Sequence, residues 1–171
     1  MLRLIAIQAM YRAEFLVRSQ SVSEYAISRD DIEYCLLATE YNCNGYQPEN
    51  CDELLDKANC IISIFVNMHV LFDDIIRKSL ETSDWDRDRI DPVILSLFRC
   101  YASETVYQKK ELLSSNESNE VDNYDINQEY LTVARFFSDD MKENKFILAV
   151  IKCMQKLLND DNTMANSCIS V

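Results

Sequence analysis

The chain has 171 residues, 48% of them apolar, and a formal net charge of −12 at pH 7. This size suits one domain whose core needs no disulfide or metal. The single glycine, Gly45, excludes the glycine-rich loops that cradle phosphates and dinucleotides, because such loops need several residues with positive φ. One glycine and two prolines also favour long helices with few tight turns, so we expect an all-α domain.

Apolar residues recur at helical spacing along most of the chain, and we expect a compact bundle of six or seven helices. The expected helices span residues 2–19, 24–41, 51–81, 92–107, 125–137 and 143–159. Turn-forming residues fill 42–50, and the segment 114–123 is polar and acidic. We therefore assign residues 1–160 to one all-helical domain and residues 161–171 to a polar C-terminal tail.

The helix that begins at residue 92 is expected to lie at the centre of the bundle. Asp91 is a good N-cap, and Pro92 suits the first helical position, where its missing N–H costs nothing. Arg99 and Glu104 fall off the apolar stripe of this helix, which makes them available to solvent, an ion pair or a partner. Trp85, the only tryptophan, is expected to fill the gap between this helix and the long helix before it.

Seven cysteines form no C-x-x-C pair and are odd in number, which argues against a zinc site and a disulfide framework. Charged and polar residues interrupt the N-terminal stretch, so it is no signal peptide, and no run approaches the roughly 18 apolar residues of a membrane span. We expect reduced thiols in a cytoplasmic protein that spans no membrane and needs no cofactor or metal. His69 shares a helix face with Asp73, but we expect a hydrogen-bonded structural histidine and no catalytic site.

Charge is distributed unevenly along the chain. Residues 30–60 carry a net charge of −7, and residues 111–130 hold six acidic side chains and no basic one. Residues 1–20 and 135–156 each carry a net charge of +2. The overall charge argues against nucleic acid, whose binding depends on neutralising phosphates, but these two segments have the sign that RNA needs.

Three blocks of the chain resemble the NusB family of bacterial transcription antitermination factors. The central block matches without a gap through Trp85, Arg89, Asp91, Pro92, Arg99 and Glu104. Residues 3–15 (RLIAIQAMYRAEF) are similar to the family's first helix, and residues 126–158 to its ending, where an acidic turn precedes a Lys-Phe pair. The chain departs from the family at Ser103, where tyrosine is usual, and it has no arginine before Arg3, where the family usually has several.

The resemblance implies a non-enzymatic transcription antitermination factor that binds boxA RNA of nascent ribosomal RNA. Its partners would be NusE, a ribosomal small-subunit protein, and the RNA polymerase antitermination complex. RNA-binding roles are implied for Arg3, Gln8, Tyr11, Arg89, Arg99, Lys142, Lys145 and Phe146. We expect Arg3 and Lys145 to form two cationic tips side by side. The family contains monomers and dimers, so a homodimer stays open.

Several of these residues also have a structural interpretation. Gln8 and Tyr11 would pack in the bundle, and Phe146 lies on an apolar stripe. Asp139 and Asp140 would stabilise the start of the last helix through its dipole. An alternative function is therefore a helical protein-interaction module that keeps NusE binding but has lost RNA recognition. A ribosomal RNA cytosine methyltransferase, a class that also carries a NusB-like domain, is disfavoured because the chain has no glycine-rich loop.

Overall fold

The structure, a computed structural model, describes residues 1–20, 25–42, 50–81, 89–114 and 126–160. These residues form six α-helices and no strand, which confirms the all-α prediction. The helices are α1 (Leu2–Gln20), α2 (Arg29–Asn42), α3 (Cys51–Leu80), α4 (Pro92–Ser114), α5 (Ile126–Phe137) and α6 (Met141–Asp160). Outside the described residues lie Trp85, most of the turn segments 42–50 and 114–123, and the tail 161–171.

The centre of the bundle is formed by α3 and by α4, which packs against α1, α3, α5 and α6 and is buried at residues 94–104, so the expected central position of the helix from residue 92 is confirmed.

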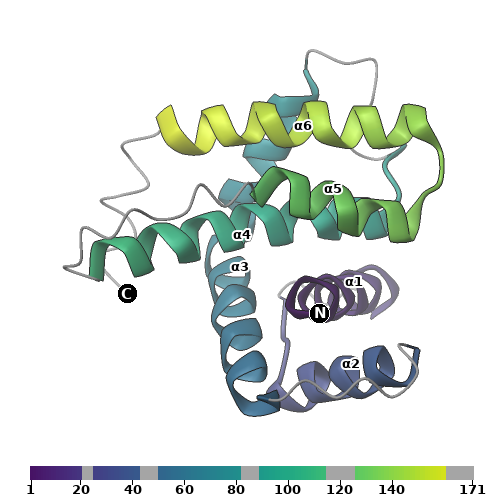
Figure 1. The fold of residues 1–171 in the computed structure, drawn as a ribbon, viewed down its shortest axis with the longest axis vertical. Coiled ribbons are helices and arrows are strands. Elements are labelled where there is room, and N and C mark those ends of the chain that lie inside the picture. The colour runs from purple at the N-terminus through teal and green to yellow at the C-terminus, as the bar shows by residue number, and fades with distance from the viewer. Residues whose placement is uncertain (21–24, 43–49, 82–88, 115–125, 161–171) are drawn as a thin grey trace.

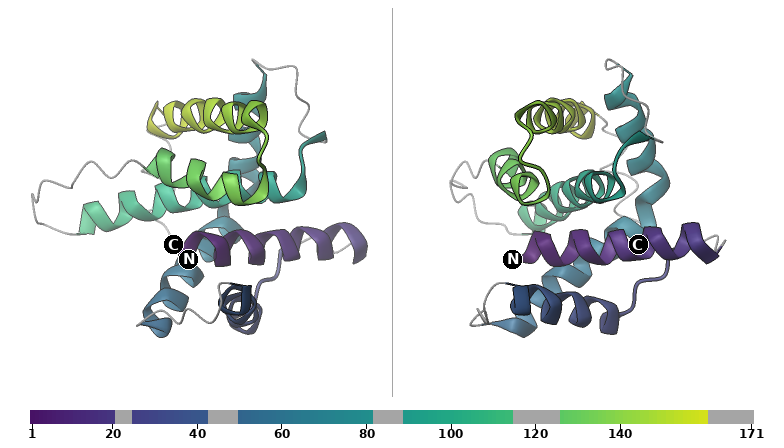
Figure 2. Two further views of the ribbon diagram at one scale, coloured as in Figure 1. Left: turned by 45° about the vertical axis from the view of Figure 1, so that its right-hand side comes forward. Right: turned by 90° about the vertical axis from the view of Figure 1, so that its right-hand side faces the viewer.

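Helix α3 crosses most of the molecule. It runs from the level of α2 to the level of α6, while α4, α5 and α6 lie across its upper half and α1 passes between α2 and α4 (Figure 1, Figure 2). Helices α1, α2, α4 and α6 all pack against it. The expectation that no run is long and apolar enough for a membrane span is wrong, because α3 meets both criteria by length and composition, although ten of its residues are buried in the bundle.

One apolar core connects all six helices. Large apolar side chains with almost no exposed surface come from α1, α2, α3, α4 and α6, and among them are Ile5, Ile7, Met10, Ile32, Ile61, Ile62, Phe65, Phe72, Phe98, Ile147, Ile151 and Met154. Complete burial of a side chain of this kind contributes about 1.5–3 kcal/mol each. The helical periodicity of the sequence therefore corresponds to a real buried face in every helix.

Side chains at the helix starts account for where the helices begin. The Asp91 carboxylate accepts a hydrogen bond from the Val93 amide at 2.8 Å, which confirms Asp91 as the cap of α4. The expected start of α2 at residue 24 is wrong. Ser28 Oγ accepts from the Asp31 amide at 3.2 Å, and the Asp31 carboxylate accepts from the Ser28 amide at 3.0 Å. This reciprocal cap starts the helix one residue after Ser28.

A buried arginine on α4 ties three helices together. Arg99 has no exposed surface; its Nη1 donates to Glu14 of α1 at 2.6 Å, and its Nε and Nη2 donate to the two carboxylate oxygens of Asp73 of α3 at 2.9 Å. Nη2 also donates to the Tyr25 hydroxyl at 3.0 Å, and the guanidinium lies over the rings of Tyr25 and Phe65. The RNA contact expected at Arg99 is wrong, because a side chain without exposed surface cannot touch a ligand on the protein surface.

The charges of this cluster stabilise one another. Burial alone would raise the pKa of Glu14, but hydrogen bonds from Tyr25 and Arg99 outweigh burial and lower this pKa to about 2. Burial and the hydrogen bond to Glu14 raise the pKa of Tyr25 to about 12. Burial would lower the pKa of Arg99, but the bonds to Asp73 raise it above its usual range. At neutral pH the cluster therefore holds a charged arginine between charged carboxylates.

Replacing Arg99 with methionine would leave two acidic side chains in the core without their partner. We expect Arg99→Met to lower the free energy of unfolding by about 3–5 kcal/mol, measured by urea denaturation. Arg77→Met is the control, because Arg77 is 58% exposed and pairs with Asp74 and Glu81 in solvent. This control should change stability little, since exposed ion pairs are weak. Equal losses in the two variants would contradict a structural role for Arg99.

The lowered pKa of Glu14 makes stability depend on pH in a defined window. Because the folded pKa of about 2 lies below the ordinary value of 4.5, the charged form contributes stability above pH 4.5, and this contribution is lost as the pH falls towards 2. With allowance for solvent screening, the contribution is about 2 kcal/mol. When the pH is lowered from about 5 to about 2.5, the free energy of unfolding, measured by urea denaturation, should fall by about 2 kcal/mol more in wild type than in Glu14→Gln. The same pH slope in both proteins would contradict this prediction.

Candidate nucleic-acid interface

The eight residues expected to contact RNA differ in exposure. Arg99 is buried, and three others are half-buried, namely Arg3, Gln8 and Phe146. The exposed ones are Tyr11, Arg89, Lys142 and Lys145. The structure therefore does not bring the eight together as one exposed surface.

Arg3, near the start of α1, is held by two acidic side chains. Its Nε and Nη2 donate to the Glu104 carboxylate at 2.8 and 2.6 Å, and its Nη1 donates to Glu129 at 3.1 Å. The side chain is 13% exposed, and its guanidinium lies 5.2 Å from the centre of the Tyr130 ring. The expected cationic tip at Arg3 is thus neutralised by its neighbours and does not add free positive charge to that of Lys145. A phosphate would have to compete with Glu104 for Arg3.

Glu104 is the centre of a second buried polar cluster, which joins α1, α4 and α5. The Tyr130 hydroxyl donates to the Glu104 carboxylate at 2.8 Å and lies 3.1 Å from the Cys100 Sγ atom. Burial raises the pKa of Cys100 to about 12 and raises the pKa of Tyr130 well above its usual value. Both groups are therefore protonated at neutral pH, and a protonated thiol is a poor nucleophile.

Helix α1 exposes two aromatic rings, whereas its Gln8 and Arg12 side chains contact α2. The Gln8 side-chain oxygen accepts a hydrogen bond from the Thr39 hydroxyl at 3.1 Å, which ties α1 to α2. Arg12 pairs with an aspartate of α2 at 3.3 Å and lies over a tyrosine ring of the same helix. Tyr11 is 39% exposed, and Phe15, one turn further on the same face, is also exposed. Sequence reasoning singled out Tyr11 but missed Phe15.

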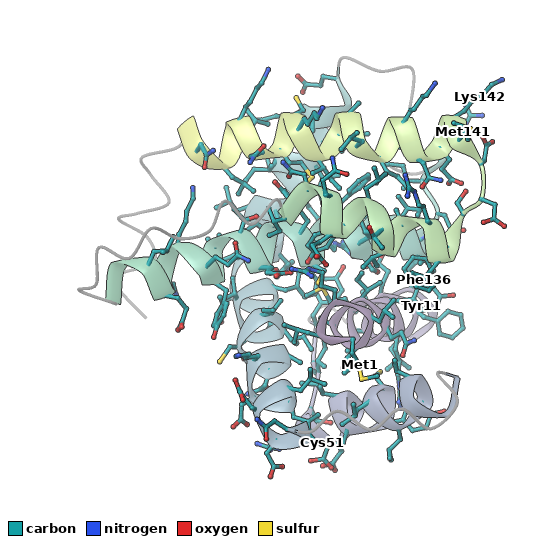
Figure 3. All side chains as sticks on the ribbon, in the orientation of Figure 1. Met1, Tyr11, Cys51, Phe136, Met141 and Lys142 are labelled. Carbon is teal, nitrogen blue, oxygen red and sulfur yellow. The ribbon has the colours of Figure 1, made fainter. Side chains whose placement is uncertain are left out.

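The start of α6 carries exposed cations next to exposed apolar side chains. Lys142 and Lys145 are exposed, and neither makes an ion pair within the described residues. Phe136 is 73% exposed, Met141 is 72% exposed, and Phe137 is exposed to a smaller degree. We refer to these five residues as the turn edge. Figure 3 shows Lys142 pointing away from the bundle, with Phe136 and Met141 on the same side of the molecule.

Local hydrogen bonds fix the backbone of the turn edge. The Asp140 carboxylate accepts from the Lys142 amide at 2.7 Å, so α6 begins at Met141, two residues earlier than expected. The Asn144 side-chain amide donates to the Ser138 carbonyl at 3.0 Å, and the Asp140 amide donates to the Ser138 hydroxyl at 3.2 Å. The structural interpretation of Asp140, as a residue that stabilises the helix start, is confirmed. The two lysines consequently project from the first turns of a well-anchored helix.

Phe146, the aromatic residue expected to stack on a base beside Lys145, is half-buried. The Phe146 ring packs edge-to-face on Phe98, with ring centres 6.5 Å apart, which favours its structural interpretation. Phe136 and Phe137 are the exposed rings at the turn edge, and sequence reasoning missed them. The signal was available: consecutive residues on a helix point about 100° apart, so two adjacent phenylalanines at a helix end cannot both face the core.

No metal-binding group accompanies this surface in the part of the chain that the structure describes. His69 Nδ1 hydrogen-bonds the Val66 carbonyl at 2.9 Å, and its ring packs on Tyr25 and Phe65, which confirms a structural histidine. No group of His, Cys, Asp and Glu side chains is placed to hold a metal ion within these residues. The cysteines found as free thiols are Cys35, Cys51, Cys60, Cys100 and Cys153. Cys43 and Cys168 lie outside the described residues.

Comparisons of the chain with protein-family models, with curated proteins and with solved structures give no match. The resemblance to NusB therefore rests on the sequence blocks alone. Three residues of those blocks, Arg3, Arg99 and Glu104, make contacts between helices of this bundle. These contacts give the three residues a structural role, and exposed side chains of the blocks include those of the turn edge, Tyr11, Phe15 and Arg89.

Proposed function

We propose that the chain is a NusB-like RNA-binding adaptor, a cytoplasmic and non-enzymatic antitermination factor that binds boxA RNA together with NusE. The observation that carries this proposal is the turn edge, where exposed phenylalanines end α5 and two exposed lysines, without an ion pair within the described residues, follow at the start of α6. Single-stranded nucleic acid is bound by this combination, because cations follow the phosphates and aromatic rings stack on the bases. The choice of boxA RNA and NusE as partners comes from the resemblance of the three sequence blocks to the NusB family.

The charge of the turn edge suits phosphate in a second way. Lys142 lies in the first turn of α6, where the helix dipole adds partial positive charge. Asp139 and Asp140 are exposed beside it, so a strand is repelled from the turn itself and directed towards the helix. The site is therefore small and weak by itself, which is consistent with a protein that binds RNA as one of two partners.

The opposite charge gathers where α2 and α3 begin. Arg29 at the start of α2 pairs with Asp56 of α3 at 3.2 Å, so the two helix starts lie together. Exposed acids on these first turns are Asp30, Glu33, Asp52, Glu53 and Asp56. A basic ribosomal protein is complementary to this surface. When both proteins of the complex contact one short RNA, binding by one protein raises the effective concentration of the RNA at the other. Two weak contacts together therefore give a higher overall affinity.

A protein-interaction module that binds NusE but not RNA is the second candidate. It is favoured by two observations, the neutralised guanidinium of Arg3 and the complete burial of Arg99. Neither arginine is then available to RNA, whereas the acidic surface at the starts of α2 and α3 stays available to a basic protein. A pull-down that retains NusE, with no change in RNA anisotropy with or without NusE, would support this candidate. A homodimer stays open, and size-exclusion chromatography with light scattering would measure the oligomeric state.

The turn edge should control RNA affinity. We expect Lys142→Gln/Lys145→Gln to weaken binding of fluorescein-labelled boxA RNA, measured by anisotropy in the presence of NusE, and to reduce the salt dependence of log K by about 1.4, since each lost contact to a single strand contributes about 0.7. Phe136→Ala should weaken binding about five- to thirtyfold, because stacking of one base on an aromatic ring contributes about 1–2 kcal/mol.

Matched controls separate these effects from changes in fold or total charge. Lys57→Gln removes a cation that is paired with Glu53, and Val70→Ala shortens an exposed apolar side chain on α3. Both should leave RNA affinity unchanged. RNA binding by wild type that is insensitive to every turn-edge variant would place the RNA site elsewhere and refute the proposed role of this surface.

A further inference from the structure

Four lysines follow one line along the exposed side of α6. They are Lys142, Lys145, Lys152 and Lys156. At about 100° per residue they fall within an arc of about 80°, and at about 1.5 Å per residue they extend over about 21 Å. The other side chains classed as exposed on the described part of α6 are uncharged, namely Met141, Ala149 and Asn159. We refer to the four lysines as the α6 stripe.

The α6 stripe differs from the cations of the first three helices. Every arginine and lysine that the structure describes in α1, α2 and α3 pairs with an acidic side chain, and these are Arg3, Arg12, Arg18, Arg29, Lys57, Arg77 and Lys78. No lysine of the α6 stripe makes an ion pair within the described ranges. In a protein with a net charge of −12, four exposed cations on one helix face form a local positive field that attracts a polyanion, and Asp139, Asp140 and Glu143 weaken this field only near Lys142 and Lys145.

Contacts at both ends of α6 hold the α6 stripe in place. The cap from Asp140 anchors the first turn. Near the other end, Lys109 Nζ of α4 donates to the Leu158 carbonyl at 2.8 Å, and the Asn127 side-chain amide of α5 donates to the Gln155 side-chain oxygen at 3.1 Å. The lysines thus project from a helix fixed on two neighbours, and a ligand need not order the backbone that carries them.

We propose that an RNA strand held at the turn edge continues along α6, with its phosphates against Lys152 and Lys156. This inference rests on the proposed RNA binding and extends it to two residues outside the turn edge. A length of about 21 Å accommodates about six phosphates at the 3.4 Å spacing of a stacked strand. Lysine offers charge without the planar fork with which arginine recognises bases. This half of the site therefore adds affinity and no sequence preference.

The face suits RNA better than a membrane or a protein partner. Ala149 is the one apolar side chain classed as exposed between the first and last lysine of the stripe, so the described face has nothing to insert among lipid headgroups. A protein interface needs an apolar or aromatic centre, which this face lacks. The exposed aromatic rings, Phe136 and Phe137, lie instead at one end of the stripe, where they can stack on bases of the same strand.

The test compares three RNAs and two charge-matched variants. Labelled boxA RNA, with or without about eight added uridines at either end, is titrated with the full chain and NusE. In wild type the better-placed extension should raise affinity about five- to tenfold and steepen the salt dependence of log K by about 1.4, as expected for two added contacts. Lys152→Gln/Lys156→Gln should remove both gains and leave binding of the unextended RNA unchanged. Lys57→Gln/Lys78→Gln removes the same charge from paired lysines and should keep both gains.

The outcomes separate this inference from the proposed function. If unextended RNA binds wild type but neither extension adds affinity, the α6 proposal alone is overturned. If neither RNA binds, the proposed function is overturned with it. Equal losses in the two double variants would attribute the effect to total charge and overturn the role of the α6 stripe. Binding of phosphatidylserine vesicles that depends on Lys152 and Lys156, without any gain from the RNA extension, would overturn it in favour of a membrane.

Discussion

The guanidinium of Arg99 is the point where α1, α3 and α4 meet. It bonds Glu14 and Asp73 at the same time and lies over the rings of Tyr25 and Phe65. Removing a buried charge from water is costly, and this cost is offset only when all donors are satisfied. Here two carboxylates and the Tyr25 hydroxyl accept hydrogen bonds from all three guanidinium nitrogens, so one side chain links the three helices. The second cluster, around Glu104, does the same for α1, α4 and α5.

These two clusters change what the resemblance to NusB means. Two of the three arginines that suggested RNA contact from sequence alone, Arg3 and Arg99, are held by acidic side chains of other helices, while exposed lysines lie on α6 and exposed phenylalanines at the end of α5. Arginine suits both tasks for the same reason, because its planar fork binds two oxygens of a carboxylate or of a phosphate. A motif cannot tell these uses apart; burial can.

Much of the fold could be predicted from the sequence, because helix formation here follows local rules. Apolar periodicity placed all six helices, and the Asp91-Pro92 pair located the start of α4. The start of α2 was misplaced because Ser28 and Asp31 cap each other, a signal that competes with the apolar residue Tyr25 further upstream. Local patterns decide where a helix exists; the cap decides where it begins.

The candidate site was harder to predict, since it depends on which side chains other helices cover. Glu104 and Glu129 reach Arg3 from more than a hundred residues away, so no spacing rule could show that its charge is neutralised. The exposure of Phe136 likewise depends on where α5 ends relative to α6. By contrast, the α6 stripe could have been read from the sequence, because four lysines on one helical face need no tertiary information.

The shared guanidinium of Arg99 also bears on how such a chain can diverge. Glu14, Asp73 and Arg99 lie far apart in the sequence but balance one another's charge, so a change at one is tolerated only when the others change with it. Surface residues such as Lys152 face no such condition. Over many generations the interior ionic triad would therefore change more slowly than such exposed side chains.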